Sequence, residues 1–215
     1  MPETKKITLA KYAGFCYGVK RAVEAVLSLK EQNSDTGICV LGELIHNSQV
    51  IDELANCGIE TLSELPKCGN GICVVRTHGQ TPEMFKQIED VGFKVYDLTC
   101  PDVKKVQQTA IKFVQEGYYL VIIGKAEHPE VSAIKANAMQ YGEKVVVASD
   151  INVLKNIEQD LIFHKKIGVV VQTTQMLSTL NPIVEYLTSI SKELRIANTI
   201  CPSTSLRQNE VLEMS

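Results

Sequence analysis

The chain has 215 residues, of which 45% are hydrophobic and 22% are charged, as in a globular protein with a buried core. Its net charge of −3 argues against nucleic acid as a partner, because nucleic-acid-binding domains carry a basic surface. No apolar run approaches the ~18 residues that span a bilayer, and the N-terminus lacks the apolar segment of a signal peptide. We therefore expect a cytoplasmic protein that binds neither nucleic acid nor membranes.

Short apolar runs rich in β-branched residues alternate with helical segments, which predicts an α/β fold. The expected strands are residues 7–10, 37–42, 71–76, 118–124, 144–149 and 167–172. Strands that are apolar throughout are usually covered on both faces, as in mainly parallel sheets. The apolar spacing predicts helices at 18–31, 49–56, 82–90, 102–117 and 181–194. The last of these should begin at Asn181 and Pro182, a good N-cap and first helical residue.

Three of the seven cysteines occupy similar local contexts. Cys16, Cys100 and Cys201 each follow a short extended stretch and open a helix-like segment. The N–H groups of a helix N-terminus favour a thiolate, and thiolates suit a soft metal centre. The repetition indicates three βα lobes that each offer one thiol. The competing interpretation is three buried structural cysteines, the commoner role of an isolated cysteine.

The other four cysteines are less suited to binding a metal. Cys39 and Cys73 fall inside predicted strands, and Cys57 and Cys68 lie near glycine-bearing turns. A zinc site made of Cys68, Cys73 and His78 is a minor alternative. The odd number of cysteines and the expected reducing compartment argue against a disulfide framework.

Three of the four histidines follow predicted strands. His46, His78 and His128 come after the strands at 37–42, 71–76 and 118–124. In open α/β sheets, ligand-binding groups gather beyond the carboxyl ends of the strands. These histidines therefore indicate a polar pocket for a phosphate-bearing ligand. His164 has no such context and is expected on the surface.

The same pocket should hold a carboxylic acid and several neutral polar groups. Glu130 follows His128 by two residues, and apolar walls raise the pKa of a carboxyl group until it donates a proton near neutral pH. The alternative role for Glu130 is a solvated residue at a helix start. Gln172, Thr173 and Thr174 end the strand at 167–172, and Thr204 follows Cys201. The chain has no P-loop and no GxGxxG motif, so a nucleotide cofactor has no support.

Taken together, the motifs resemble one enzyme family, the 4-hydroxy-3-methylbut-2-enyl diphosphate reductases. Any one motif is weak evidence, but seven in order across residues 14–208 are highly specific. The motifs are AGFCYGVKRAV, GELIHNSQVIDEL, RTHGQTP, DLTCPDVKKV, IGKAEHPEV, VVQTT and TICPSTSLRQ.

The resemblance implies an oxidoreductase of the non-mevalonate route to isoprenoid precursors. Its cofactor would be a 4Fe-4S cluster held by Cys16, Cys100 and Cys201, with one iron left open for substrate. The implied diphosphate ligands are the three strand-end histidines, helped by Thr204, Gln172 and Thr174. Glu130, assisted by Thr173, would protonate the allylic hydroxyl so that it leaves as water. Two electrons from an external carrier such as ferredoxin or flavodoxin would then yield isopentenyl and dimethylallyl diphosphate.

The fold that the resemblance implies is a trefoil of three small α/β lobes around a central cluster. The first lobe would be residues 18–100 and the second 101–197. Residues 1–17 plus 198–215 would form part of the third. Because the family's third lobe continues further and adds diphosphate-binding side chains, a chain ending at Ser215 should have an incomplete third lobe and be impaired in activity.

Two other interpretations of the sequence compete with this resemblance. Quinolinate synthase also has three lobes around a three-cysteine cluster, but the segments AEHPE and VVQTT argue against it. A non-catalytic metal-binding or nucleotide-binding α/β module is the alternative from another functional class, and a colourless protein that contains zinc and no iron would favour it.

Overall fold

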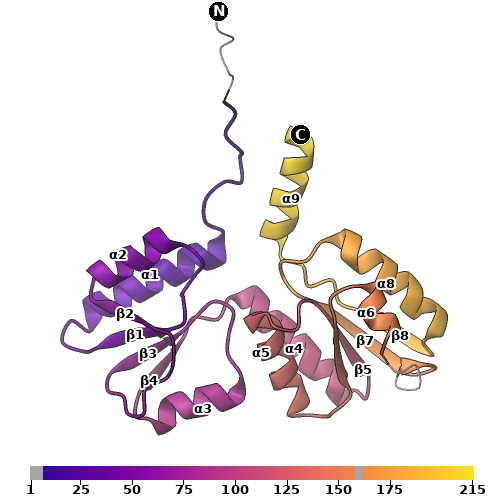
Figure 1. The fold of residues 1–215 in the computed structure, drawn as a ribbon, viewed down its shortest axis with the longest axis horizontal. Helices are drawn as coiled ribbons and strands as arrows, with labels where there is room; N and C mark the ends of the chain where they lie inside the picture. Colours follow the sequence, from indigo (N-terminus) through magenta and orange to yellow (C-terminus); the bar gives the residue numbers. More distant parts are fainter. Residues whose placement is uncertain (1–6, 158–161) are drawn as a thin grey trace, which may run out of the picture.

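The structure is a computed structural model that describes residues 7–157 and 162–215. Two parallel β-sheets of four strands each lie side by side, and helices flank both (Figure 1). The predicted α/β class is confirmed. No helix in the described ranges is long and apolar enough to cross a membrane.

The first sheet has the strand order β2-β1-β3-β4, and all its strands are parallel. Its elements, which we call the first lobe, are α1 (Tyr17–Gln32), β1 (Ile38–Leu41), α2 (Ser48–Asn56), β2 (Ile59–Leu62), β3 (Ile72–Val75), α3 (Pro82–Asp90) and β4 (Lys94–Asp97). Val26 of α1 and Leu54 of α2 belong to the core on one face of the sheet. Ile88 of α3 belongs to the core on the other face. Burial on both faces explains why β1 and β3 are apolar at every position.

The second sheet repeats this arrangement with the order β6-β5-β7-β8, again parallel. Its elements, the second lobe, are α4 (Pro101–Gln115), β5 (Tyr119–Ile123), α5 (Pro129–Met139), β6 (Val145–Ala148), α6 (Ile151–Lys155), β7 (Lys166–Val171), α8 (Leu177–Ile190) and β8 (Glu193–Ile196). Phe113 of α4 and Ile134 of α5 pack on one face. Ile183 and Leu187 of α8 pack on the other.

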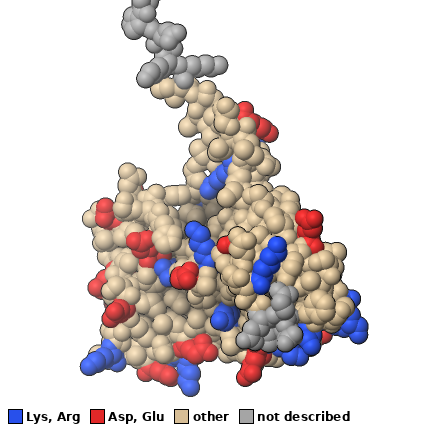
Figure 2. Space-filling view, turned by 45° about the vertical axis from the view of Figure 1, so that its right-hand side comes forward, with Lys and Arg blue, Asp and Glu red and all other residues tan. Residues whose placement is uncertain are grey.

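Residues 11–14 contact the C-terminal helix above the lobes. The N-terminal segment and α9 (Pro202–Met214) rise together from the region between the sheets (Figure 1). Glu210 of α9 accepts the backbone N–H groups of Lys11 and Tyr12, and Arg207 donates to the carbonyl oxygens of Tyr12 and Gly14. In the space-filling view of Figure 2, this pair projects from the body of the molecule, with a hollow at its base.

Two of the expected elements are wrong. Residues 7–10 are not a strand, because β-branched residues form a strand only beside a pairing partner, and among the described residues this segment has none. The helix expected at 181–194 runs from Leu177 to Ile190, with Pro182 inside it. Leu180 belongs to the same buried stripe as Ile183 and Leu187, so burial extends the helix upstream of the proline. The other predicted strands lie within one residue of their expected ends.

Candidate functional site

One cavity between the two lobes and α9 brings the three cysteines in matching contexts together. Cys16, Cys100 and Cys201 all border this cavity, whose volume is about 380 Å³. Each is the N-cap of a helix, α1, α4 and α9 respectively. Pro101 and Pro202 start the last two helices at a position where a missing N–H costs no hydrogen bond. The strand-to-helix placement read from the sequence thus brings together thiols from three parts of the chain.

Gly18 and Asp102 set the surroundings of the thiols. A Cβ atom on Gly18 would lie 2.7 Å from Sγ of Cys100 and 4.0 Å from Sγ of Cys16, so only glycine leaves the thiols their space. Cys201 Sγ donates a hydrogen bond of 3.2 Å to Oδ2 of Asp102, in the first turn of α4. Asp102 therefore links two of the three helix starts.

The ionisation of the thiols departs from the expectation of thiolates. Burial raises the pKa of Cys100, although backbone N–H groups of α4 act in the opposite direction, as a helix N-terminus should. Burial and the hydrogen bond to Asp102 likewise raise the pKa of Cys201. Desolvation outweighs the helix N-terminus at both positions, so these two cysteines are thiols in the metal-free protein.

The four remaining cysteines lie outside the cavity. Cys39 and Cys73 are buried in β1 and β3, where they are register partners, and Cys57 and Cys68 are exposed. No group of three or more histidine, cysteine, aspartate or glutamate side chains in the described part of the chain is placed to hold a single metal ion. The zinc site considered at Cys68, Cys73 and His78 therefore has no geometric support.

The three strand-end histidines form a row beside the thiols. The ring centroids of His46 and His78 are 5.1 Å apart, and those of His78 and His128 are 5.3 Å apart. Only His78 belongs to the wall of the cysteine cavity, and its Nδ1 is buried without a partner among the described residues. The His46 side chain is 61% exposed and contacts Glu43, with 2.8 Å between Nδ1 and Oε2. The row therefore leads outward from the cavity.

His78 and His128 are neutral at physiological pH. Burial, together with the nearby charges of Arg76, His128 and His46, lowers the pKa of His78 to about 4. Burial also lowers the pKa of His128, with smaller contributions from His46, Arg76 and Lys125. Neutral imidazoles avoid the cost of holding several cations side by side, and an arriving anion would restore their affinity for protons.

Glu130 and Thr173 form a buried pair on the wall of the same cavity. Glu130 is 1% exposed, and its two carboxylate oxygens accept the backbone N–H and the hydroxyl of Thr173, each at 2.7 Å. The backbone N–H of Glu130 in turn donates to Nδ1 of His128 at 3.1 Å. Burial raises the pKa of Glu130, although both hydrogen bonds from Thr173 act in the opposite direction. The carboxyl group therefore keeps its proton to a higher pH than an exposed glutamate.

The other predicted polar residues differ in where their side chains point. Thr174 and Thr204 border the cavity. Gln172 is 3% exposed, and its amide is used inside the protein: Oε1 accepts the Lys125 N–H at 3.1 Å, and Nε2 donates to Thr174 at 3.0 Å. Gln172 thus holds two loops at the edge of the site.

Sequence reasoning missed several residues of the cavity wall. Asp102, Arg207 and Gln208 border it, beside Ser203, which the sequence had placed next to Thr204 just after Cys201. Asp102 follows Cys100 by two residues, as Ser203 follows Cys201, so the helix starts themselves pointed to these positions. Arg207 and Gln208 lie one turn further along α9, on the same side as Ser203 and Thr204, which the helical period explains.

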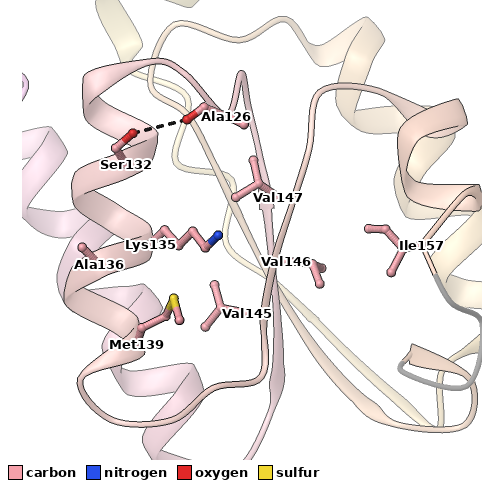
Figure 3. A pocket seen from close by; sticks show the side chains of 9 residues that line it. All are labelled: Ala126, Ser132, Lys135, Ala136, Met139, Val145, Val146, Val147 and Ile157. Carbon is pink, nitrogen blue, oxygen red and sulfur yellow. Dashed lines mark hydrogen bonds between the residues drawn. The ribbon is translucent and has the colours of Figure 1, made fainter.

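A second hollow, of about 550 Å³, lies beside the edge strand β6 (Figure 3). Val145 and Val147 point toward α5, whereas Val146 points the other way, toward Ile157, as strand alternation requires. Lys135 is the single charged residue of its lining. This hollow offers no acid, thiol or histidine among the described residues, so the cysteine cavity is the candidate active site.

Comparison with known sequences agrees with this site. The family model described as LytB protein matches residues 7–215. A protein of Syntrophotalea carbinolica named 4-hydroxy-3-methylbut-2-enyl diphosphate reductase is 39% identical over 210 residues, 98% of this chain and 72% of that protein. A protein of Geobacter sulfurreducens with the same name is 38% identical over 205 residues, 95% of this chain and 70% of that protein.

Solved structures agree as well. A structure of (E)-4-hydroxy-3-methyl-but-2-enyl diphosphate reductase, described as the terminal enzyme of the non-mevalonate pathway, matches with a TM-score of 0.83 and 34% identity, over 97% of this chain and 72% of that one. The E-1-hydroxy-2-methyl-but-2-enyl-4-diphosphate reductase of Plasmodium falciparum matches with a TM-score of 0.77 and 25% identity, over 91% of this chain and 61% of that one. The chain therefore belongs to the LytB protein family.

Proposed function

We propose that this chain carries the catalytic cavity of a reductase that converts 4-hydroxy-3-methylbut-2-enyl diphosphate to isopentenyl and dimethylallyl diphosphate. The observation that carries the proposal is one cavity bordered by three helix-capping thiols, a buried acid and the inner end of a histidine row. Membership of the LytB family supports the same reaction. In this proposal, residues 1–17 and 198–215 belong to a third lobe, beside lobes at 18–100 and 101–197.

The residues of the cavity suit an iron–sulfur cluster. Thiols are the usual ligands of such clusters, and Cys16, Cys100 and Cys201 border a shared space instead of meeting at one point, as a single ion would require. Three thiols for a four-iron cluster leave one iron open to substrate. When bound, the cluster delivers two electrons from an external carrier and a Lewis-acidic iron. Because burial keeps Cys100 and Cys201 protonated, loading should release protons.

The histidine row supports binding of the diphosphate. His78 is the member on the cavity wall, and the rings of His46 and His128 both lie next to it. Each neutral imidazole offers one N–H donor, and a diphosphate needs several convergent donors. Thr204 and Thr174 add hydroxyl groups on the wall. Gln172 contributes indirectly, by holding Thr174 in place.

Glu130 and Thr173 support protonation of the leaving hydroxyl. Hydroxide is a poor leaving group, so the allylic carbon–oxygen bond breaks readily only if the oxygen receives a proton and departs as water. The raised pKa of Glu130 keeps that proton available, and the hydroxyl of Thr173 can pass it on across their 2.7 Å hydrogen bond. The balanced reaction consumes the alcohol, two electrons and two protons, and yields the alkene and water; the second proton goes to carbon.

The test of this function is purification without oxygen, followed by an optical spectrum and counts of iron and sulfide. We expect a brown protein with close to four irons per chain. Replacement of Cys16, Cys100 or Cys201 by serine should lower the iron content, whereas Cys57→Ser and Cys68→Ser, at exposed positions outside the cavity, should not. A colourless protein that binds zinc would instead favour a non-catalytic metal-binding module.

The activity assay supplies the protein with substrate and a chemical reductant and measures the two isomeric products. Ferredoxin or flavodoxin would be the natural electron carrier, and exchanging one for the other in the assay identifies it. We place the reaction in the cytoplasm, where seven free cysteines would stay reduced. A version extended to the length of its relatives that holds iron and binds substrate but forms neither product would contradict the proposed reaction.

A further inference from the structure

The two lobes repeat the same framework at the edge that faces the site (Figure 1). Leu41 at the end of β1 pairs with Val75 of β3, and Ile123 at the end of β5 pairs with Val171 of β7. A glycine follows each first strand: Gly42 donates its N–H to Leu62, and Gly124 donates to Ala148. His46 and His128 each come four residues after these glycines. The histidines at the ends of the row therefore occupy equivalent positions.

The residues after β3 in the first sheet and after β7 in the second are equivalent in the same way. The backbone N–H of Cys100 donates to the carbonyl of Thr77, and that of Cys201 donates to the carbonyl of Thr173, both at 2.9 Å. Thr77 and Thr173 are thus equivalent, and so are the residues before them, Arg76 and Gln172. The Arg76 side chain packs on Gly42, and the Gln172 side chain packs on Gly124. A Cβ on Gly42 would lie 2.8 Å from Nη1 of Arg76, and one on Gly124 would lie 2.8 Å from Oε1 of Gln172.

The two equivalent side chains differ in what they bind. Gln172 uses both ends of its amide within the second lobe, on Lys125 and Thr174. The Arg76 guanidinium has no hydrogen bond and no ion pair with any described residue, and its Nε is buried without a partner. Glu43 is the nearest source of compensating charge, but its carboxylate is bonded to His46. Arg76 is therefore a half-buried cation whose buried Nε has no partner, and such a group is costly to hold, which indicates a role toward a ligand.

We propose that Arg76 is a positioning residue of the diphosphate site: its guanidinium holds a permanent positive charge behind the histidine row and attracts the diphosphate to it. This inference rests on the proposed function and adds to it Arg76, the first residue of the motif RTHGQTP, to which the sequence alone assigned no role. Burial lowers the pKa of Arg76, yet an arginine remains charged, so this cation needs no proton from solution.

Arg76 acts through the histidines. Its charge is one of the causes that lower the pKa of His78 and His128, after burial itself. The free pocket then holds the fixed charge of Arg76, with that of the exposed Lys125 nearby, beside neutral imidazoles at His78 and His128. The charged and titratable groups around the row are Glu43, His46, Arg76, His78, Lys125, His128 and Glu130.

The experiment replaces Arg76 by the residue that the second lobe uses in its place. Arg76→Gln should fold, because a glutamine side chain already packs on the equivalent glycine. Binding of inorganic diphosphate is measured by calorimetry from pH 6 to 8, and histidine pKa values by NMR titration of the ligand-free protein. At pH 8 we expect the dissociation constant to rise about tenfold or more, which is the size of a lost charged contact. The pKa of His78 and His128 should rise, so binding should recover partly at pH 6.

Matched variants separate the outcomes. Arg76→Lys keeps the charge and should restore both binding and the histidine titration. Arg195→Gln removes an exposed arginine that pairs with Glu116 and should change neither. If Arg76→Gln binds diphosphate at pH 8 as tightly as the wild type, the inference about Arg76 is overturned and the proposed function is untouched. If binding weakens while the histidine pKa values stay unchanged, Arg76 does not act through the histidines but contacts the diphosphate directly. If the wild type itself binds no diphosphate, the diphosphate site of the proposed function fails as well.

Discussion

At Glu130, burial and hydrogen bonding act in opposite directions on one carboxyl group. Burial raises its pKa, and the N–H and hydroxyl of Thr173 lower it, with burial the larger of the two. The result is an acid that stays protonated above its ordinary pKa while both oxygens remain fixed in place. A general acid needs this combination of a retained proton and a defined direction for its transfer.

We expect Glu130→Gln to keep the fold and lose most turnover. The amide retains the shape and the hydrogen bonds with Thr173 but has no proton to give, and general acids typically contribute ~10²–10⁴-fold to a rate. Iron content and binding of inorganic diphosphate should stay at the wild-type level. The rate of product formation under a chemical reductant checks the prediction, and turnover near the wild-type rate would assign the proton to another group.

His78 should make the fold sensitive to acid. Its pKa is about 4 in the folded protein and 6.5 in an unfolded chain, so the neutral form is favoured by folding. The stability that depends on this neutrality is present above pH 6.5 and is lost as the pH falls from 6.5 toward 4. His78→Asn cannot take up this proton. The melting temperature of His78→Asn should therefore fall less than that of the wild type between pH 7 and 4. If the melting temperatures of the two proteins fall in parallel, the lowered pKa of His78 is contradicted.

At the scale of elements, the start of α1 is shaped by the thiols it lies against. Gly18 is the second residue of this helix, where alanine is ordinarily better than glycine by up to ~1 kcal/mol. A Cβ there would lie 2.7 Å from Sγ of Cys100. We therefore expect Gly18→Ala to retain the fold but to displace the thiol and lower the iron content after anaerobic loading.

Gly37→Ala is the matched control for this variant. Its added Cβ would lie 3.7 Å from the nearest atom, an ordinary contact, and Gly37 precedes β1, at the opposite end of that strand from the site. Iron per chain and the melting temperature are measured for both variants. Full iron loading of Gly18→Ala would mean that the thiols have more room than the structure gives them.

The sequence predicted the central strands and the edge strand β6, but it did not predict the edge strands β2, β4 and β8. β1, β3, β5 and β7 are apolar on both faces, and such runs stand out in any sequence. β2, β4 and β8 are only partly buried, and their mixed composition resembles that of loops. The false strand at 7–10 shows the converse: an apolar, β-branched run becomes a strand only if a neighbour completes its hydrogen bonds.

The residues of the candidate site were also predicted only in part from the sequence. Cys16, Cys100, Cys201 and the three histidines could be predicted because strand ends and helix starts leave local signals. Gln172 could be predicted as a site residue, but the sequence could not show that its amide bonds Lys125 and Thr174 within the second lobe. Arg76 opens the motif RTHGQTP, but the sequence assigned it no role, because its place becomes meaningful only when the two lobes are compared in space.

At the scale of the whole molecule, the site depends on how two similar lobes face each other. Parallel sheets direct the carboxyl ends of their strands to one edge, and here the two edges meet beneath α9 and the N-terminal segment (Figure 1). Cys16 lies at the base of that segment and Cys201 at the base of α9. The contacts between segment and helix therefore lie directly above two of the three thiols.

Glu210 is the centre of these contacts, and its removal should loosen the segment without unfolding the lobes. Its carboxylate accepts the N–H groups of Lys11 and Tyr12, so Glu210→Ala leaves both amides to solvent. Ile7 and Leu9 are 93% and 86% exposed, so burial of these two large side chains does not hold the segment. Hydrogen–deuterium exchange of the N-terminal peptide should accelerate, while the melting temperature stays that of the wild type, because the cores of both sheets lie elsewhere.

Glu213→Ala, on the same helix, is the control and should leave the exchange unchanged. Equal exchange in Glu210→Ala and the wild type would show that Arg207, through Tyr12 and Gly14, is sufficient to hold the segment.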